Sequence, residues 1–180
     1  PVIFTQGERQ VFLKGEAFFD VAKDTSKPFV VSLSRGDITV YGTRFNVNDY
    51  EESDLSAVLV EGSIGFKSIK GESVRLEPSD RLVCEATTGT ISVEKVDTML
   101  YTAWVDKMFI FSGQPLVEIM TTLSRWYDFN ISFESEDIKY IRLSGQLNRY
   151  QDIRVLLNTY EEVAGIKFKI EGKNIQISRE

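Results

Sequence analysis

Apolar and polar residues alternate along the first part of the chain in short runs such as DITVYG, TRFNVNDY and SIGFKS. Alternation with a period of two predicts strands that have one buried and one exposed face. In the stretch 40–66, Gly42 and Gly62 would allow tight bends. The side chains of this stretch that we expect to fill the core are Phe45, Val47, Leu59, Ile64 and Phe66.

Turn segments such as SRGD, YEESD, IKGES and TTGT separate these runs. Glycine, serine and acidic residues of this kind favour tight turns. Strands that recur every eight to twelve residues or so are typical of a sandwich, a barrel or a short coil of strands. The pattern does not choose among these β-rich architectures.

The period changes near residue 104, where apolar residues begin to recur at helical spacing. One predicted helix follows Pro115, and a second spans about 151–163, with Gly165 in the left-handed position after its end. The apolar residues of the second helix that are expected on one face are Ile153, Leu156, Leu157, Tyr160 and Val163. With strands at about 131–134 and 141–147 and a terminal hairpin, the order is β-α-β-β-α-β-β.

These two patterns predict two domains. Residues 1–103 form a β-rich N-terminal domain, a short strand coil or a sandwich. Residues 104–180 form a small α+β domain, which is large enough to fold alone, though only just. The segment 100–106 is the expected joint.

Composition then removes several classes of function. The formal net charge is −6, whereas a nucleic-acid-binding protein normally shows a basic face, so we expect no nucleic-acid partner. The chain contains no histidine, the commonest general base and metal ligand. The single cysteine, Cys84, lies in an alternating run and is interpreted as a small core residue.

No grouping of residues carries recognisable chemistry. Carboxylates cluster at 51–54, 134–137 and 161–162, but they lie in predicted turns or on a polar helix face, where acids are normally solvated. The serines have no histidine to activate them, and EGSIG lacks the lysine and the following helix of a phosphate-binding loop. We therefore predict no enzyme activity, no catalytic residues, no cofactor and no metal.

No window of the sequence approaches the roughly 18 apolar residues of a membrane span. The sequence begins abruptly at PVIFTQGERQ, without a signal peptide. We expect it to be a piece of a longer protein, with any membrane anchor outside it.

Several ordered motifs carry a family resemblance. GEAFFDVAKDTSKPFVV (15–31), VYGTRFNV (40–47) and VLVEGSIGF (58–66) resemble the FecR family of bacterial anti-sigma regulators. The later LEPSDRL resembles its L-x-P-G-E/D turn, with Ser79 in place of glycine. Residues from FIFSGQP onward look like the small domain that follows FecR domains, similar in plan to the short N-terminal domain of secretins and TonB-dependent receptors. Lys107 stands where that family commonly has a glycine.

The resemblance implies the periplasmic domain of a single-pass inner-membrane protein. Such a protein controls an extracytoplasmic-function sigma factor through a cytoplasmic segment, and it touches the membrane only through its transmembrane helix; both would lie outside this sequence. The implied signal comes from the signalling domain of a TonB-dependent outer-membrane receptor. Regulated proteolysis then frees the sigma factor.

Within this framework, four side chains are candidates for partner binding: Arg142, Arg149, Tyr150 and Arg154. Cations near one helix start would steer an acidic partner, and the terminal hairpin would extend the surface. The alternative interpretation is that these arginines are merely solvated. A different function, carbohydrate binding or another cell-surface interaction, is suggested by the many aromatic residues.

Overall fold

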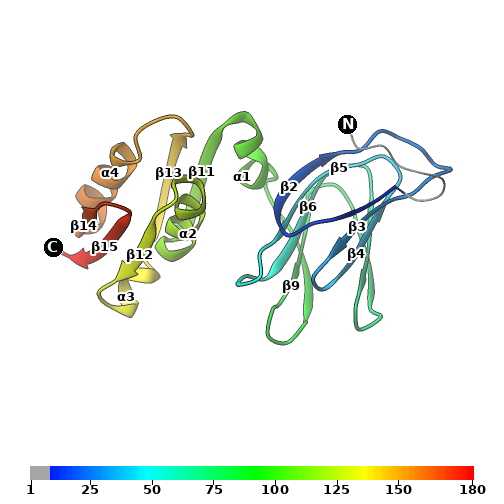
Figure 1. Ribbon diagram of the computed structural model, residues 1–180, viewed down its shortest axis with the longest axis horizontal. Coiled ribbons are helices and arrows are strands. Elements are labelled where there is room, and N and C mark those ends of the chain that lie inside the picture. Colours follow the sequence, from blue (N-terminus) through cyan, green and yellow to red (C-terminus); the bar gives the residue numbers. More distant parts are fainter. Residues whose placement is uncertain (1–8) are drawn as a thin grey trace. The chain divides into compact units, whose positions relative to one another are not determined.

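The computed structural model describes residues 9–180, and the chain divides into two compact units (Figure 1). The first unit ends at Thr102 and the second begins at Ala103. The boundary predicted from the sequence lies one residue further along the chain.

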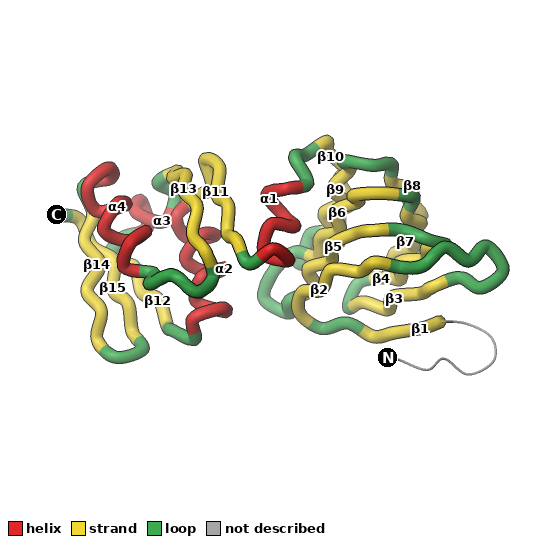
Figure 2. Tube along the Cα trace, turned by 90° about the horizontal axis from the view of Figure 1, so that it is seen from above, coloured by secondary structure: helices red, strands yellow, loops and turns green. Residues whose placement is uncertain are grey.

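The first unit contains two five-stranded sheets (Figure 2). The first sheet consists, in spatial order, of β1 (Arg9–Phe12), β3 (Phe29–Leu33), β4 (Gly36–Val40), β7 (Ile64–Ser68) and β8 (Ser73–Leu76). The second sheet consists of β10 (Ile91–Lys95), β9 (Asp80–Cys84), β6 (Leu55–Glu61), β5 (Arg44–Asp49) and β2 (Gly15–Asp20). Neighbouring strands are antiparallel except for β1 and β3, and the short helix α1 (Met99–Thr102) ends the unit.

The two sheets share one hydrophobic core, so the architecture is a β-sandwich. Both sheets contribute alternate side chains to a single cluster. The five residues predicted to fill the core are at most 2% exposed: Phe45, Val47, Leu59, Ile64 and Phe66. Cys84 is also buried, and that burial raises the pKa of its thiol. The β-rich prediction for this part of the chain is confirmed.

A buried carboxylate links the two sheets. Asp49 at the end of β5 is 3% exposed, and it accepts hydrogen bonds from the Ser34 backbone N–H at 2.7 Å and from the Ser34 hydroxyl at 2.5 Å. Ser34 lies in the turn between β3 and β4, which belong to the other sheet. The Arg35 guanidinium lies 3.9 Å from the same carboxylate. Burying a charge is costly unless it is paired in this way.

The second unit is the predicted α+β domain. Its elements are β11 (Met108–Pro115), α2 (Leu116–Tyr127), β12 (Asn130–Phe133), α3 (Glu136–Lys139), β13 (Arg142–Asn148), α4 (Arg154–Ala164), β14 (Ile166–Glu171) and β15 (Asn174–Arg179), after a 3₁₀ turn at Ala103–Asp106. Strands β11 and β13 pair with each other, and β12, β15 and β14 form a second sheet in that order. The four-residue α3 was not predicted, because it is too short to show a helical period.

Helix α4 shows which parts of the helical prediction hold. Leu156, Leu157 and Tyr160 are buried as predicted, and burying a side chain of this size stabilises a fold by about 1.5–3 kcal/mol. Gly165 ends the helix with φ 60° and ψ 43°, which confirms the left-handed position. The prediction for Val163 is wrong, since this side chain is 67% exposed. Periodicity predicts the direction in which a side chain points. It does not show whether a neighbouring element extends far enough to cover the last turn of the helix, where Val163 lies.

We predict that Gly62→Ala lowers the stability of the first unit through a steric clash. A Cβ at Gly62, where φ is +95°, would lie 2.7 Å from the Gly42 carbonyl oxygen. Gly71→Ala is the matched control, since φ is +90° there but no atom lies within 4 Å of the added Cβ. We expect a loss of about 1 kcal/mol in the control and about 1–3 kcal/mol more for Gly62→Ala, measured by calorimetric unfolding. Equal losses would contradict the close approach.

Tyr160 should make the second unit sensitive to alkaline pH. Burial raises the pKa of its hydroxyl from 10.0 to about 12, and the oxygen has no hydrogen-bond partner among the described residues. The unfolded chain therefore ionises first, so stability contributed by this group is complete below pH 10 and is lost as the pH rises toward 12.

Tyr160→Phe should remove that part of the alkaline loss without lowering stability at pH 7. Both tryptophans, Trp104 and Trp126, lie in the second unit, so tryptophan fluorescence during urea unfolding reports on this unit alone. Tyr140→Phe is the control, because Tyr140 is 66% exposed. Identical pH dependence in the two variants would refute the prediction.

Candidate partner-binding site

The four candidate residues occupy three places along β13 and α4. Arg142 is the first residue of β13, Arg149 and Tyr150 follow its end, and Arg154 opens α4. A seven-residue strand at about 3.3 Å per residue separates Arg142 from Arg149 by roughly 20 Å. The structure therefore leaves Arg142 apart, where it donates a hydrogen bond to the Gly113 carbonyl oxygen at 2.8 Å.

Arg149 lies on the face of a tryptophan. The central carbon of its guanidinium is 4.2 Å from the centroid of the Trp126 ring, within the range of a cation–π interaction. Trp126 belongs to the last turn of α2, and its ring in turn contacts Phe109 at 5.4 Å and Trp104 at 5.9 Å between centroids. The exposed cation is thus supported directly by the core of the second unit.

The backbone at Arg149 is held from two sides. Its N–H donates to the Lys107 carbonyl oxygen at 2.7 Å, and its own carbonyl oxygen accepts from the Tyr127 hydroxyl at 3.1 Å. Burial raises the pKa of Tyr127, the Asp152 carboxylate raises it further and Arg149 opposes them. The Tyr127 hydroxyl therefore keeps the proton that it donates.

Tyr150 is the most exposed aromatic ring of this region. Its side chain is 74% exposed, and the Lys107 ammonium lies 5.6 Å from its ring centroid. Lys107 has φ 65°, so it occupies a left-handed conformation that normally favours glycine. We refer to Lys107, Trp126, Tyr127, Arg149 and Tyr150 as the Arg149 cluster.

Arg154 makes a different contact. Its backbone N–H donates to the Asp152 carboxylate at 2.9 Å, and its Nε lies 4.0 Å from the same oxygen. Both side chains are exposed, and an ion pair of this kind contributes little to stability. The charge of Arg154 is therefore partly balanced by its neighbour.

Three members of the Arg149 cluster were not predicted as site residues. The helical spacing after Pro115 predicts Trp126 and Tyr127 as core residues of that helix, with a sugar-stacking platform as the alternative, and Lys107 was noted only as a substitution for glycine. Strand pairing brings Lys107 to Arg149, since Met108 lies opposite Asn148 in the β11–β13 ladder. Trp126 and Tyr127 come from helix α2, which packs on β11 through Phe109. No local sequence signal reports that pairing.

Neither a metal site nor a membrane-spanning helix is found among the residues that the structure describes. No three histidine, cysteine, aspartate or glutamate residues among 9–180 come close enough together to hold a metal ion. None of the helices within these residues has the length and apolar character needed to cross a membrane.

Comparison with known proteins gives consistent matches over both units. Residues 2–65 match the family described as "FecR protein", and residues 108–177 match the family described as "FecR, C-terminal". Two crystal structures of a candidate anti-sigma factor from Parabacteroides distasonis, at 1.65 Å and 2.50 Å resolution, resemble the chain with TM-scores of 0.88 and 0.86. Each is 26% identical, and each match covers 100% of this chain and 84% of that one. No curated protein sequence matches.

We predict that Arg149→Ala destabilises the second unit by about 0.5–1 kcal/mol, because it removes the cation from the Trp126 ring. Tryptophan emission should change in the folded protein, since Trp126 loses a contact on one face. Arg142→Ala is the matched control, because the contact of its guanidinium is a hydrogen bond to the Gly113 carbonyl oxygen and not a stack on an aromatic ring. The prediction fails if both variants show the same emission spectrum and melting temperature.

Proposed function

The chain belongs to the FecR family, and from this membership we propose that it is the periplasmic signalling part of an anti-sigma factor. In this proposal it receives a signal from the signalling domain of a TonB-dependent outer-membrane receptor. A cytoplasmic segment outside this sequence, joined through a single transmembrane helix, then controls an extracytoplasmic-function sigma factor. The family is one of non-enzymatic regulators, so the function depends on binding surfaces.

The observation that carries the proposal is the family match over both units, and the surface that we propose for the partner is the Arg149 cluster. Tryptophan, tyrosine and arginine are the residue types that most often dominate the binding energy of protein interfaces. Here an arginine and a tyrosine are exposed side by side in the chain, with a tryptophan beneath the arginine. A large ring such as Tyr150, 74% exposed, gains the most from burial by a partner.

The support of the cluster favours tight binding. Side chains that are already ordered lose less conformational freedom when a partner binds. The Trp126 stack and the two backbone hydrogen bonds at Arg149 hold this part of the surface before any partner arrives. Two cations, Lys107 and Arg149, would steer an acidic surface toward it.

Calorimetric titration of the full chain with the isolated signalling domain of the receptor encoded beside it tests this proposal. We expect saturable binding by the unaltered chain. Tyr150→Ala and Arg149→Glu should each weaken it about tenfold or more, as is usual for central interface residues. Tyr150→Ala should leave the melting temperature unchanged, because the ring is exposed.

Arg142→Glu is the control for the change of charge, since Arg142 lies at the other end of β13. No saturable binding by the unaltered chain, with both proteins shown to be folded, would reject the receptor as partner. Binding that Tyr150→Ala and Arg149→Glu leave unchanged would retain the partner but reject the Arg149 cluster as its site.

A further inference from the structure

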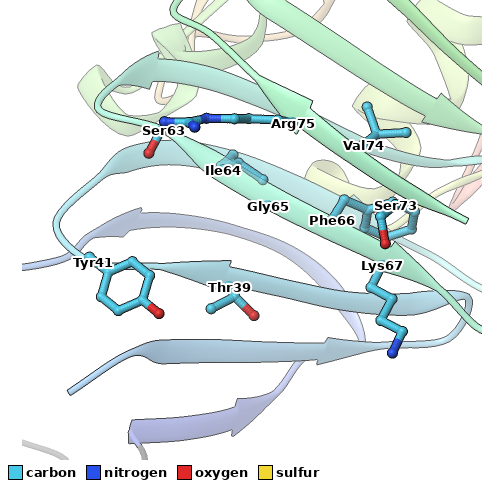
Figure 3. A pocket seen from close by; sticks show the side chains of 10 residues that line it. All are labelled: Thr39, Tyr41, Ser63, Ile64, Gly65, Phe66, Lys67, Ser73, Val74 and Arg75. Carbon is cyan, nitrogen blue, oxygen red and sulfur yellow. The ribbon is translucent and has the colours of Figure 1, made fainter. Parts of the chain in front are cut away.

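A hollow lies on the outer face of the first sheet of the sandwich, away from the shared core (Figure 3). Its volume is about 560 Å³, within the range of about 300–1,000 Å³ that is usual for small-molecule sites. Strands β4, β7 and β8 form its floor and sides. The side chains of Thr39, Lys67 and Arg75 alternate with buried ones and point to solvent. Ile64 and Phe66, which also line the hollow, are core residues.

Gly65 creates the depth of the hollow. It lies in the middle strand, directly opposite Thr39 on β4 and Arg75 on β8. A Cβ at Gly65 would contact only the Thr39 carbonyl oxygen, at 3.8 Å, and Gly65 has no left-handed φ. Neither crowding nor backbone conformation requires glycine here. Glycine inside a strand often marks a place where a ligand approaches the backbone closely.

Two cations flank Gly65. Lys67 and Arg75 are exposed, and neither forms an ion pair with any residue of 9–180 in the structure. Asp37 lies opposite Lys67 in the β4–β7 ladder, but no ion pair joins the two side chains. This local positive charge stands on a unit that has more acidic than basic residues. An anionic group is therefore the complementary ligand.

The remaining lining includes the exposed ring of Tyr41 and three hydroxyl-bearing residues, besides the apolar Ile64, Phe66 and Val74. The Tyr41 ring, 48% exposed, stands beside Thr39 at one end, and the Arg75 side chain runs along β8 toward Ser63 (Figure 3). The hydroxyls of Thr39, Ser63 and Ser73 donate no hydrogen bond to any described residue. The Tyr41 ring can pack against the C–H groups of a ligand, and the three hydroxyls can form hydrogen bonds with its hydroxyl groups.

From these features we propose that the hollow binds an anionic saccharide, specifically a sugar that carries a carboxylate. A carboxylate would accept hydrogen bonds from the Arg75 guanidinium at the Ser63 end of the hollow, while the sugar ring packs against Tyr41 above Gly65. Lys67, at the opposite end (Figure 3), would attract a further negative charge of a longer acidic saccharide. An extended peptide fits less well. A peptide that joins a sheet pairs with the free backbone groups of an edge strand, here β8, and would extend the sheet beyond β8. It would not cover Gly65, because the backbone of β7 is already paired with β4 and β8.

The test is calorimetric titration of the full chain with trigalacturonate, with neutral maltotriose and inorganic phosphate as comparison ligands. We expect saturable binding of trigalacturonate and much weaker binding of the other two. Arg75→Gln should weaken the binding of trigalacturonate about tenfold, the effect of losing one charged hydrogen bond. Gly65→Val should abolish it, because the added side chain fills the floor of the hollow.

Neither variant should lower the melting temperature, since Arg75 is exposed and valine favours a strand. Lys14→Gln removes one exposed positive charge outside the hollow and should leave binding unchanged. Three results would overturn the proposal: no saturable binding of trigalacturonate at millimolar concentration, binding that Gly65→Val and Arg75→Gln do not alter, or equal binding of phosphate. The last would mean a simple anion site. None of these outcomes bears on the receptor titration.

Discussion

The structure of the first unit depends on one constraint: each five-stranded sheet must bury one face against the other. Side chains such as Val31, Ile38 and Leu82 are completely buried in that interface. Because successive residues of a strand point to opposite sides, the same constraint forces the intervening residues outward. The outer face of the first sheet is therefore free of any role in the core, and its side chains are available for binding.

The second unit couples its surface to its core more directly. The Trp126 ring packs in a T-shaped arrangement against the ring of Phe109, a core residue. The Arg149 guanidinium lies over the Trp126 ring. A side chain with this double role makes the position of an exposed charge depend on interior packing. Rigid support of this kind lowers the entropy that a surface loses on binding, which is the physical advantage of placing the Arg149 cluster here.

Local charge matters more for this protein than its net charge. The chain carries −6 overall, yet the Arg149 cluster and the hollow around Gly65 each present two cations. A negative body discourages non-specific association with anions, while a pair of cations at one place attracts a ligand with matching charge. Both surfaces would therefore select a ligand by the positions of its negative charges as well as by their sign.

The sequence by itself determined most of the elements and the side chains that they bury, with α3 and Val163 as the exceptions. Alternation placed Phe45 and Val47 in the core, helical spacing did the same for Leu156, and Gly165 ended a helix as predicted. These features depend on residues that are close in the chain. The order of strands in the sheets and the choice of a sandwich did not follow from alternation, which fits several architectures equally well.

Only the tertiary structure decided which surface residues meet. Arg149 reaches Trp126 because β11 pairs with β13 and helix α2 packs on β11 through Phe109. Gly65 lies between Thr39 and Arg75 because β4, β7 and β8 are neighbours in one sheet. Such contacts depend on long-range strand register, and a change of one residue in register would turn every side chain of a strand to the other face. No local pattern in the sequence specifies that register, because it is set by how all the strands bury their apolar faces together.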